Sequence, residues 1–392
     1  MDTQLKDRLF QSFQTTFQVE GTHYYFSPGR VNLIGEHTDY NGGKVFPIAI
    51  TLGTYAVVSP REDQEIHAYS ENFSELGILS FSLDELTYKA TDKWSNYFKG
   101  MLLYIQEETG QTFPHGFNVY IYGTIPNGAS LSSSASLEML TGIISNDLYG
   151  YHIDGSRLAQ LGMRVENEFL NLNSGIMDQF IIANGQKDHA LLLDTNTLAF
   201  EQVPFVLKNH TLLIMNSLVK RELVTSEYNV RRQQCEEAVR ILSSELDIKT
   251  LGELTQETFV QYQYLLTDDT ILRRARHAVS ENIRTDKAAV ALKNNDLETF
   301  GQLMNESHLS LHDDYEVTVK ETDLLVRLAW NQDGVIGARM TGGGFGGCCI
   351  AIVENQRVAQ FTEAVKTGFA NEIGFEPEIY IAESADGASK LS

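Results

Sequence analysis

The chain has 392 residues and a formal net charge of -22, and hydrophobic residues make up 42% of it. This length is ample for two domains with a proper core, whereas so acidic a surface repels phosphate backbones and argues against nucleic-acid binding. Since no apolar run reaches the roughly 18 residues of a membrane-spanning helix, we expect no membrane insertion.

Hydrophobic periodicity predicts a mixture of strands and helices along the chain. In the first half it predicts helices at 5–17, 94–106, 132–148 and 156–170, and strands at 22–27, 45–50, 54–59, 66–69, 117–122 and 189–194. The second half is richer in helix, with helices predicted at 225–242, 269–291, 297–309, 318–330 and 358–372, and strands at 335–340, 348–353 and 376–381. We therefore predict an α+β fold of two domains, residues 1–205 and 206–392.

The N-terminus and the cysteines indicate a cytoplasmic protein. Residues 1–7 have neither the basic nor the apolar region of a signal peptide. Cys235, Cys348 and Cys349 form no pair of CxxC motifs, which argues against a disulfide scaffold or a zinc site and fits a reducing compartment. No segment points to an obligatory protein partner.

A Gly/Ser loop in the first half is typical of an anion site. The strand predicted at 117–122 is followed by a turn at Pro126-Asn127-Gly128, and Ser132, Ser133 and Ser134 open the next helix. Free N–H groups at a helix start, with small side chains around them, can bind a phosphate. Helix capping is the alternative, but it accounts for one serine and not three. The loop lacks the Gly-Lys-Ser/Thr of a Walker A motif, and no protein-kinase HRD or DFG motif is present.

An earlier segment, SPGRVNLIGEHTDYNGG at 27–43, combines glycines with a polar cluster. Glu36, His37 and Asp39 occupy four positions between two glycine turns. Two carboxylates and an imidazole can orient a polyhydroxylated ligand through hydrogen bonds. A divalent-metal site and a solvated turn are the alternatives, although no second histidine lies nearby. We favour a sugar ligand.

A third segment, TGGGFGG at 341–347, lies between two predicted strands. Five glycines in six residues allow positive φ and close backbone approach. A plain hairpin needs only one or two glycines. The segment is therefore expected either to face a phosphate or to form a tight contact between domains.

Two further segments contain polar residues that need an explanation. Asp178 has apolar neighbours in the chain, where a carboxylate is costly unless it is paired or functional. Tyr228, Arg231 and Arg232 lie near a predicted helix start, where packing and solvated charge are the plain interpretations.

Together these segments resemble the galactokinases of the GHMP small-molecule kinase superfamily over nearly the whole chain. The segment 28–43 is similar to the galactokinase signature, 128–136 to the second superfamily motif, and 341–347 to the third. The resemblance implies a two-domain GHMP kinase fold, with an N-terminal domain like domain 2 of ribosomal protein S5 and a ferredoxin-like C-terminal domain. It also implies an active site between them, in which ATP phosphorylates the C1 hydroxyl of α-D-galactose in galactose catabolism.

Residue roles follow from the resemblance. Asp178 matches the catalytic aspartate near the C1 hydroxyl, and Arg30 matches the arginine that contacts it and stabilises transition-state charge. The implied sugar contacts are Glu36, His37, Thr38, Asp39, Gly175 and Tyr228. The implied ATP contacts are Gly128, Ala129, Ser130, Leu131, Ser132, Ser133 and Ser134 in the loop, with Ser70 and Trp94 on the nucleotide side. Ser134 and Glu166 match Mg²⁺ positions.

Two positions depart from the common pattern. Ser130 replaces the second glycine of the phosphate loop, and a left-handed backbone there would cost serine about 1 kcal/mol. Asn171 stands where many relatives have glycine, and asparagine tolerates the left-handed region.

Two alternative functions stay open. Another superfamily kinase could act on N-acetylgalactosamine, arabinose or mevalonate; the cluster at 36–39 favours a sugar over mevalonate, but the sequence does not show the room around C2. A non-catalytic sugar sensor is the other alternative. Some galactokinase-like regulators have lost a Ser-Ala pair from the second motif, which is intact here at Ser132–Ser136 and favours catalysis.

Overall fold

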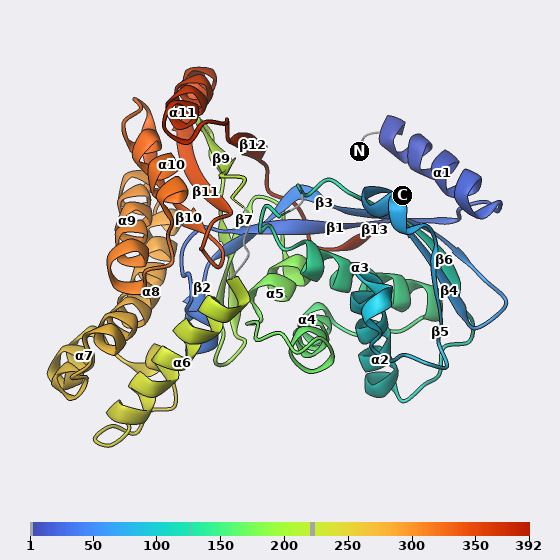
Figure 1. Ribbon diagram of the computed structural model, residues 1–392, viewed down its shortest axis with the longest axis horizontal. Coiled ribbons are helices and arrows are strands. Elements are labelled where there is room, and N and C mark those ends of the chain that lie inside the picture. The colour runs from blue at the N-terminus through green and yellow to red at the C-terminus, as the bar shows by residue number, and fades with distance from the viewer. Residues whose placement is uncertain (1–2, 127, 220–223) are drawn as a thin grey trace.

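The computed structural model describes residues 3–126, 128–219 and 224–392, which form two sheet-containing halves side by side (Figure 1). The helices are α1 Thr3–Phe17, α2 Ser95–Thr109, α3 Ser133–Tyr149, α4 Gly155–Arg164, α5 Met177–Asn184, α6 Val224–Leu242, α7 Gln256–Tyr262, α8 Asp269–Lys293, α9 Leu297–Ser310, α10 Lys320–Trp330 and α11 Val358–Ile373. The strands are β1 His23–Asn32, β2 Lys44–Val45, β3 Pro47–Pro60, β4 Glu65–Ser70, β5 Leu79–Ser82, β6 Phe117–Gly123, β7 His189–Asp194, β8 Phe200–Pro204, β9 His210–Asn216, β10 Val335–Thr341, β11 Cys348–Glu354, β12 Glu378–Ala382 and β13 Ser389–Leu391.

The first half is built on a six-stranded sheet in the order β13-β1-β3-β6-β4-β5. Helix α1 covers one face, where Leu9 and Phe13 are buried against Tyr24 and Tyr120 of the sheet. Helices α2, α3, α4 and α5 lie on the opposite side (Figure 1), and their apolar side chains share a core with the strands. The sheet is thus covered on both faces.

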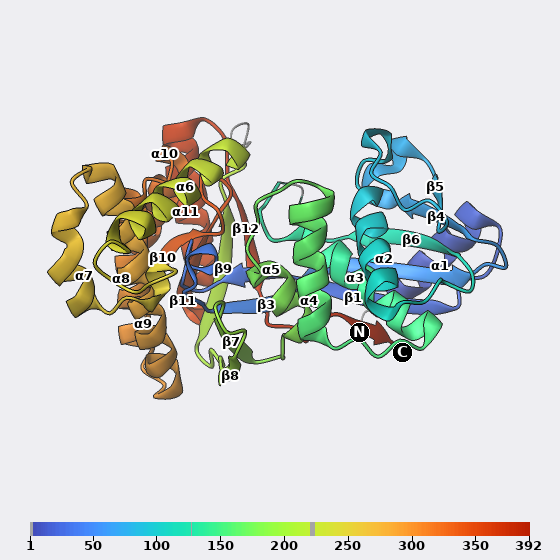
Figure 2. The same ribbon diagram turned by 90° about the horizontal axis from the view of Figure 1, so that it is seen from below.

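The second half is built on a four-stranded sheet in the order β10-β11-β9-β12. One face packs against helices α6, α8, α10 and α11. The other face carries Ile214, Ile350 and Ile352, which share an apolar cluster with Val31 and Ile48 of the first half. Figure 2, seen from below, shows β1 and β3 reaching from the first sheet to this contact. The two halves are therefore joined by a continuous apolar core.

Most predicted elements match observed ones, but the sequence prediction missed α5, α7, β5, β8, β9 and β13, and it drew some boundaries differently. The strand predicted at 45–50 begins in β2 Lys44–Val45, and the rest of it joins the strand predicted at 54–59 in a single strand, β3 Pro47–Pro60. The sequence prediction missed β9 His210–Asn216, because a short continuous apolar run buried on both faces has no diagnostic periodicity. It also merged α4 with Val165–Phe169, which forms a separate π-helical turn.

The C-terminal strand crosses back to the first half. Strand β13 pairs antiparallel with β1, with Leu391 opposite Tyr24. The boundary between residues 205 and 206 stays a prediction.

No helix in the described ranges is both long and apolar enough to cross a membrane.

Candidate active site

A cavity of about 780 Å³ opens where the two halves meet. It is lined by these sequence-predicted residues: Arg30, Glu36, His37, Asp39, Gly128, Ala129, Ser130, Ser132, Ser133, Ser134, Glu166, Gly175, Asp178 and Tyr228. The three motif segments are far apart in the sequence, yet all of them contribute to this one cavity. Its size and its mixture of polar groups suit a small-molecule site.

Asp178 forms hydrogen bonds with residues of both the first and the second motif. It lies in the first turn of α5, where the helix dipole favours a carboxylate. Arg30 donates from Nε to Oδ1 at 2.9 Å and from Nη2 to Oδ2 at 3.0 Å, and the hydroxyl of Ser132 donates to Oδ2. The Arg30 side chain is buried, whereas 30% of the Asp178 side chain stays accessible. The pairing therefore orients the carboxylate and leaves it open to the cavity.

The start of α3 differs from the starts of α4, α8 and α9. An Asp side chain caps α4, α8 and α9 by accepting N–H groups of the first turn. Ser132, which precedes α3, has φ 64° and makes no cap bond, and its hydroxyl donates to Asp178. Capping therefore does not explain this serine, and the first-turn N–H groups remain available to an anion. Asn127, part of the predicted turn before this helix, lies outside the described residues.

Ser134 and Glu166 form a small oxygen-rich pair beside the phosphate loop. The Ser134 hydroxyl donates to Glu166 Oε1 at 3.0 Å. Burial, followed by the charge of Asp178, raises the pKa of Glu166. No group of three or more His, Cys, Asp or Glu side chains converges as a metal cage in the described part of the chain. A hydroxyl and one carboxylate nevertheless fit Mg²⁺, which takes most of its other ligands from phosphates and water.

His37 is held in a buried chain of hydrogen bonds. Its Nδ1 lies 2.8 Å from the Tyr40 hydroxyl, which lies 2.7 Å from the Tyr315 hydroxyl, and the Cys235 thiol lies 3.2 Å from Tyr315. Burial lowers the pKa of His37 to about 3, so the ring is neutral near pH 7. Nδ1 is engaged by Tyr40, and Nε2 is buried beside Gly343 of the third motif.

Asp39 and Gly175 are in close contact at one wall of the cavity. A Cβ atom on Gly175 would lie 1.8 Å from Asp39 Oδ2, so only glycine fits. Burial raises the pKa of Asp39 to about 6, and the charge of Asp178 adds to the rise. The ring of Tyr228 lies 5.5 Å from that of His37, which places Tyr228 beside the same polar cluster.

The third motif packs against the second motif and against Tyr228. Gly342, Gly344, Gly346 and Gly347 all have positive φ. A Cβ atom on Gly342 would lie 3.6 Å from the Ser130 carbonyl oxygen, and a Cβ atom on Gly344 would lie 2.4 Å from Val317 O. The tight approach at Gly344 lies within the second half, whereas Gly342 makes an ordinary van der Waals contact with the first half. Gly342 and Gly343 also line the cavity.

Four predicted residues are not among the described residues that line the cavity: Thr38, Ser70, Trp94 and Leu131. Thr38 is buried and braces the first motif, because its hydroxyl contacts Gly35 O at 2.9 Å and Lys44 O at 2.7 Å. Leu131 is buried in the apolar cluster between the halves. Ser70 ends β4, and Trp94 directly precedes α2. Their assigned roles at the sugar and the nucleotide stay predictions.

Sequence reasoning missed two buried charges behind the first motif. Arg339 on β10 and Glu281 on α8 are fully buried, and both contact the turn at Gly35 and Glu36. A charged residue inside the apolar strand predicted at 335–340 was a usable signal, since such a charge must be paired.

Family models match three parts of the chain. The galactokinase galactose-binding signature matches residues 11–60. The N-terminal domain of GHMP kinases matches residues 96–186, and the C-terminal domain of GHMP kinases matches residues 288–371.

Curated relatives match over almost the full length. A galactokinase of Enterococcus faecalis is 54% identical over 387 residues, covering 99% of this chain and 100% of the relative. A galactokinase of Ligilactobacillus salivarius is 54% identical over 374 residues, covering 95% and 96%.

Solved structures indicate the same family as the family models and the curated relatives. Lactococcus lactis galactokinase complexed with galactose superposes with a TM-score of 0.95 at 45% identity, covering 99% of this chain and 100% of that one. Methanococcus jannaschii mevalonate kinase superposes with a TM-score of 0.68 at 20% identity, covering 93% and 99%, which shows a shared fold. The fold is that of a GHMP kinase, and within that class the chain belongs to the galactokinase family.

The contact between Gly175 and Asp39 predicts a specific mutational effect. Gly175→Ala places a methyl group where Asp39 Oδ2 now lies, so Asp39 must move and the KM for the sugar should rise at least about tenfold, equivalent to about 1.4 kcal/mol. Steady-state kinetics measure this. The control is Gly123→Ala, whose added methyl group would come no closer than 3.4 Å to another atom. An unchanged sugar KM in Gly175→Ala would contradict the prediction.

The backbone of Ser130 predicts different stability effects for two substitutions. Its φ of 59° confirms the left-handed conformation that the motif suggested. Ser130→Gly should change the free energy of unfolding by less than about 0.5 kcal/mol, because about 1 kcal/mol of relieved strain is offset by extra entropy of the unfolded chain. Ser130→Val should destabilise by at least about 1 kcal/mol, since β-branched residues disfavour this region. Urea unfolding measures both, and equal stability of the two variants would contradict the assignment.

Proposed function

We propose that this protein is an ATP-dependent galactokinase that transfers the γ-phosphate of ATP to the C1 hydroxyl of α-D-galactose, giving galactose 1-phosphate and ADP. The observation that carries the proposal is the contact of Asp178 with both Arg30 and Ser132. These contacts place the Asp178 carboxylate, which can bind a sugar hydroxyl, and the start of α3, which can bind phosphate, in the same cavity.

Phosphoryl transfer depends mainly on positioning and on stabilising charge. The N–H groups at the start of α3 and the loop 128–134 bind the nucleotide phosphates. Arg30, buried and bonded to Asp178, also donates from Nη1 to the Ser130 carbonyl at 2.7 Å. It therefore holds the phosphate loop and the carboxylate in one geometry and offers positive charge next to the transferred group.

Asp178 receives or orients the proton of the C1 hydroxyl. Its two oxygens accept from Arg30 and Ser132, which aligns the remaining lone pairs with a ligand in the cavity. Glu36, Asp39, His37 and Tyr228 surround the sugar with hydrogen-bond acceptors and a neutral imidazole, as expected for a polyhydroxylated ligand.

Mg²⁺ would be held by Ser134 and Glu166 together with phosphate oxygens. When bound, it supplies charge neutralisation for the β- and γ-phosphates. The three buried thiols support a reducing compartment, and we assign the protein to the cytoplasm and to galactose catabolism.

Replacing the Asp178 carboxylate tests the assignment directly. Asp178→Asn keeps one acceptor for Arg30 but cannot take a proton, so kcat should fall about 10²- to 10⁴-fold while the fold survives. A coupled ADP assay measures turnover and circular dichroism measures folding. Asp269→Asn, at an exposed ion pair on α8, is the control and should retain full activity. Near-normal turnover in folded Asp178→Asn would overturn the role.

The pKa of Asp39 predicts the acid limb of the pH profile. With a pKa of about 6, the carboxyl gains a proton as the pH falls below 6 and loses acceptor strength for sugar hydroxyls. The kcat/KM for galactose should therefore fall about tenfold per pH unit below 6, because this quantity reports ionisations of the free enzyme.

The matching variant is Asp39→Asn, which cannot titrate. Its kcat/KM should be low throughout and nearly flat between pH 5 and 7. If Asp39→Asn retains the wild-type acid limb, another group such as Glu166 controls it.

A further inference from the structure

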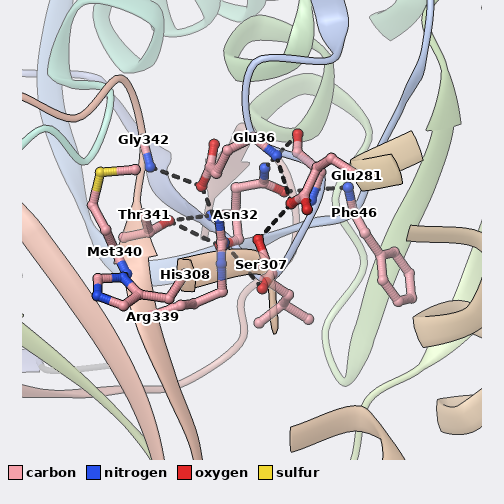
Figure 3. Close-up of polar contacts among 12 residues, drawn as sticks. Asn32, Glu36, Phe46, Glu281, Ser307, His308, Arg339, Met340, Thr341 and Gly342 are labelled. Atoms are coloured by element: carbon pink, nitrogen blue, oxygen red, sulfur yellow. Dashed lines mark hydrogen bonds and ion pairs between the residues drawn. The ribbon is translucent and has the colours of Figure 1, made fainter. Parts of the chain in front are cut away.

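A buried ion pair links the first motif to the strand that leads into the third. Arg339 Nη1 donates to Glu36 Oε1 at 3.2 Å, and the exposed fractions of the two side chains are 0% and 3%. Figure 3 shows Arg339 on β10 directed toward Glu36, with Gly342 bonded to the same carboxylate from the other side. The pair therefore joins residues that lie about 300 positions apart in the chain.

The ion pair between Arg339 and Glu36 is not expected to contribute much to the stability of the fold. Arg339 Nη1 also donates to the carbonyls of Asn32 and Leu33, both at 3.2 Å, but its Nε and Nη2 atoms are buried without a partner in the described structure. Burying a charge so incompletely paired carries a desolvation penalty, and apolar replacements of buried ion pairs are often neutral or stabilising. The location of the pair beside the cavity indicates instead that it fixes the direction of the Glu36 side chain.

The contacts on Glu36 leave one oxygen for a ligand. Arg339 and the Gly342 N–H, the latter at 2.8 Å, both bond Oε1. The described residues make no hydrogen bond with Oε2, and Glu36 lines the cavity. The carboxylate is thus anchored through one oxygen and presents the other.

The backbone of the same turn is held from the opposite side by α8. Glu281 accepts from the N–H groups of Gly35 at 3.0 Å and of Glu36 at 3.3 Å, and it accepts the Ser307 hydroxyl at 2.6 Å (Figure 3). With the backbone fixed by α8, the side chain of Glu36 has its direction set by Arg339.

We propose that Arg339 is a positioning residue for galactose, which aims the free oxygen of Glu36 at a sugar hydroxyl and ties the third motif to the occupied sugar site. The inference rests on the proposed function, because it needs Glu36 to contact the sugar. Arg339 is fully buried and does not line the cavity, so its effect on the sugar passes through Glu36.

A double-mutant cycle tests the proposal on the full chain. The variants are Glu36→Gln, Arg339→Met and the double variant, with KM for galactose, KM for ATP and kcat measured separately. Arg339→Met should raise the galactose KM at least about tenfold and leave the ATP KM within about twofold. The double variant should match Glu36→Gln within about twofold, since the two residues act as one unit.

A matched control separates positioning from general damage to β10. Asn305 accepts the Ala338 N–H at 2.9 Å, next to Arg339 in the strand, without contacting Glu36. Asn305→Ala should lower the melting temperature but keep the galactose KM of the wild type.

The outcomes are distinguishable. An unchanged galactose KM in Glu36→Gln would overturn the sugar role of Glu36 in the proposed function. A raised KM in Glu36→Gln with an unchanged KM in folded Arg339→Met would overturn the role of Arg339. If Arg339→Met does not fold, the double variant is the test, because it lacks the Glu36 charge that Arg339→Met leaves unpaired. A galactose KM in the double variant well above that of Glu36→Gln would show that Arg339 acts independently of Glu36, and it would overturn the proposal.

Discussion

The paired contact of Arg30 with Asp178 is the interaction on which the site depends. It brings the end of β1, the phosphate loop and the start of α5 to one point. Because Arg30 is buried, its charge requires partners, and it finds them in the carboxylate and the loop carbonyl. Asp178 also accepts the hydroxyl of Ser132, which makes no cap bond to α3, and the first-turn N–H groups of that helix are available to an anion.

An acidic protein that binds ATP needs local compensation for its charge. The cavity contains Asp39, Glu166 and Asp178 within one cluster, and burial together with their mutual repulsion raises the pKa of the first two. Arg30, the first turn of α3 and the proposed Mg²⁺ counter this field where the phosphates enter. A second cation, Arg339, lies behind the first motif and is paired with Glu36.

Much of the fold was predictable where the pattern was local. The helix at 133–149 and the strand at 189–194 were predicted to within one residue, because their periodicity and boundary residues lie within the segment itself. The strand β9 escaped prediction although it is central in its sheet, since its burial on both faces comes from partners distant in the chain. Apolar periodicity also did not distinguish the π-helical turn that contains Glu166 from the α-helix before it.

The sequence alone determined the chemistry: three polar, glycine-rich motifs, their residue types, and the family they resemble. Only the tertiary structure decided which of these residues are in contact. Ser132 bonds Asp178 and does not cap its own helix, and Asp39 occupies the space that a side chain on Gly175 would need. Arg339 bonds the side chain of Glu36, and Glu281 bonds its backbone N–H. The reason is physical. Side-chain identity is a local property, whereas the pairing of a buried charge depends on which distant segment the core brings within hydrogen-bond distance.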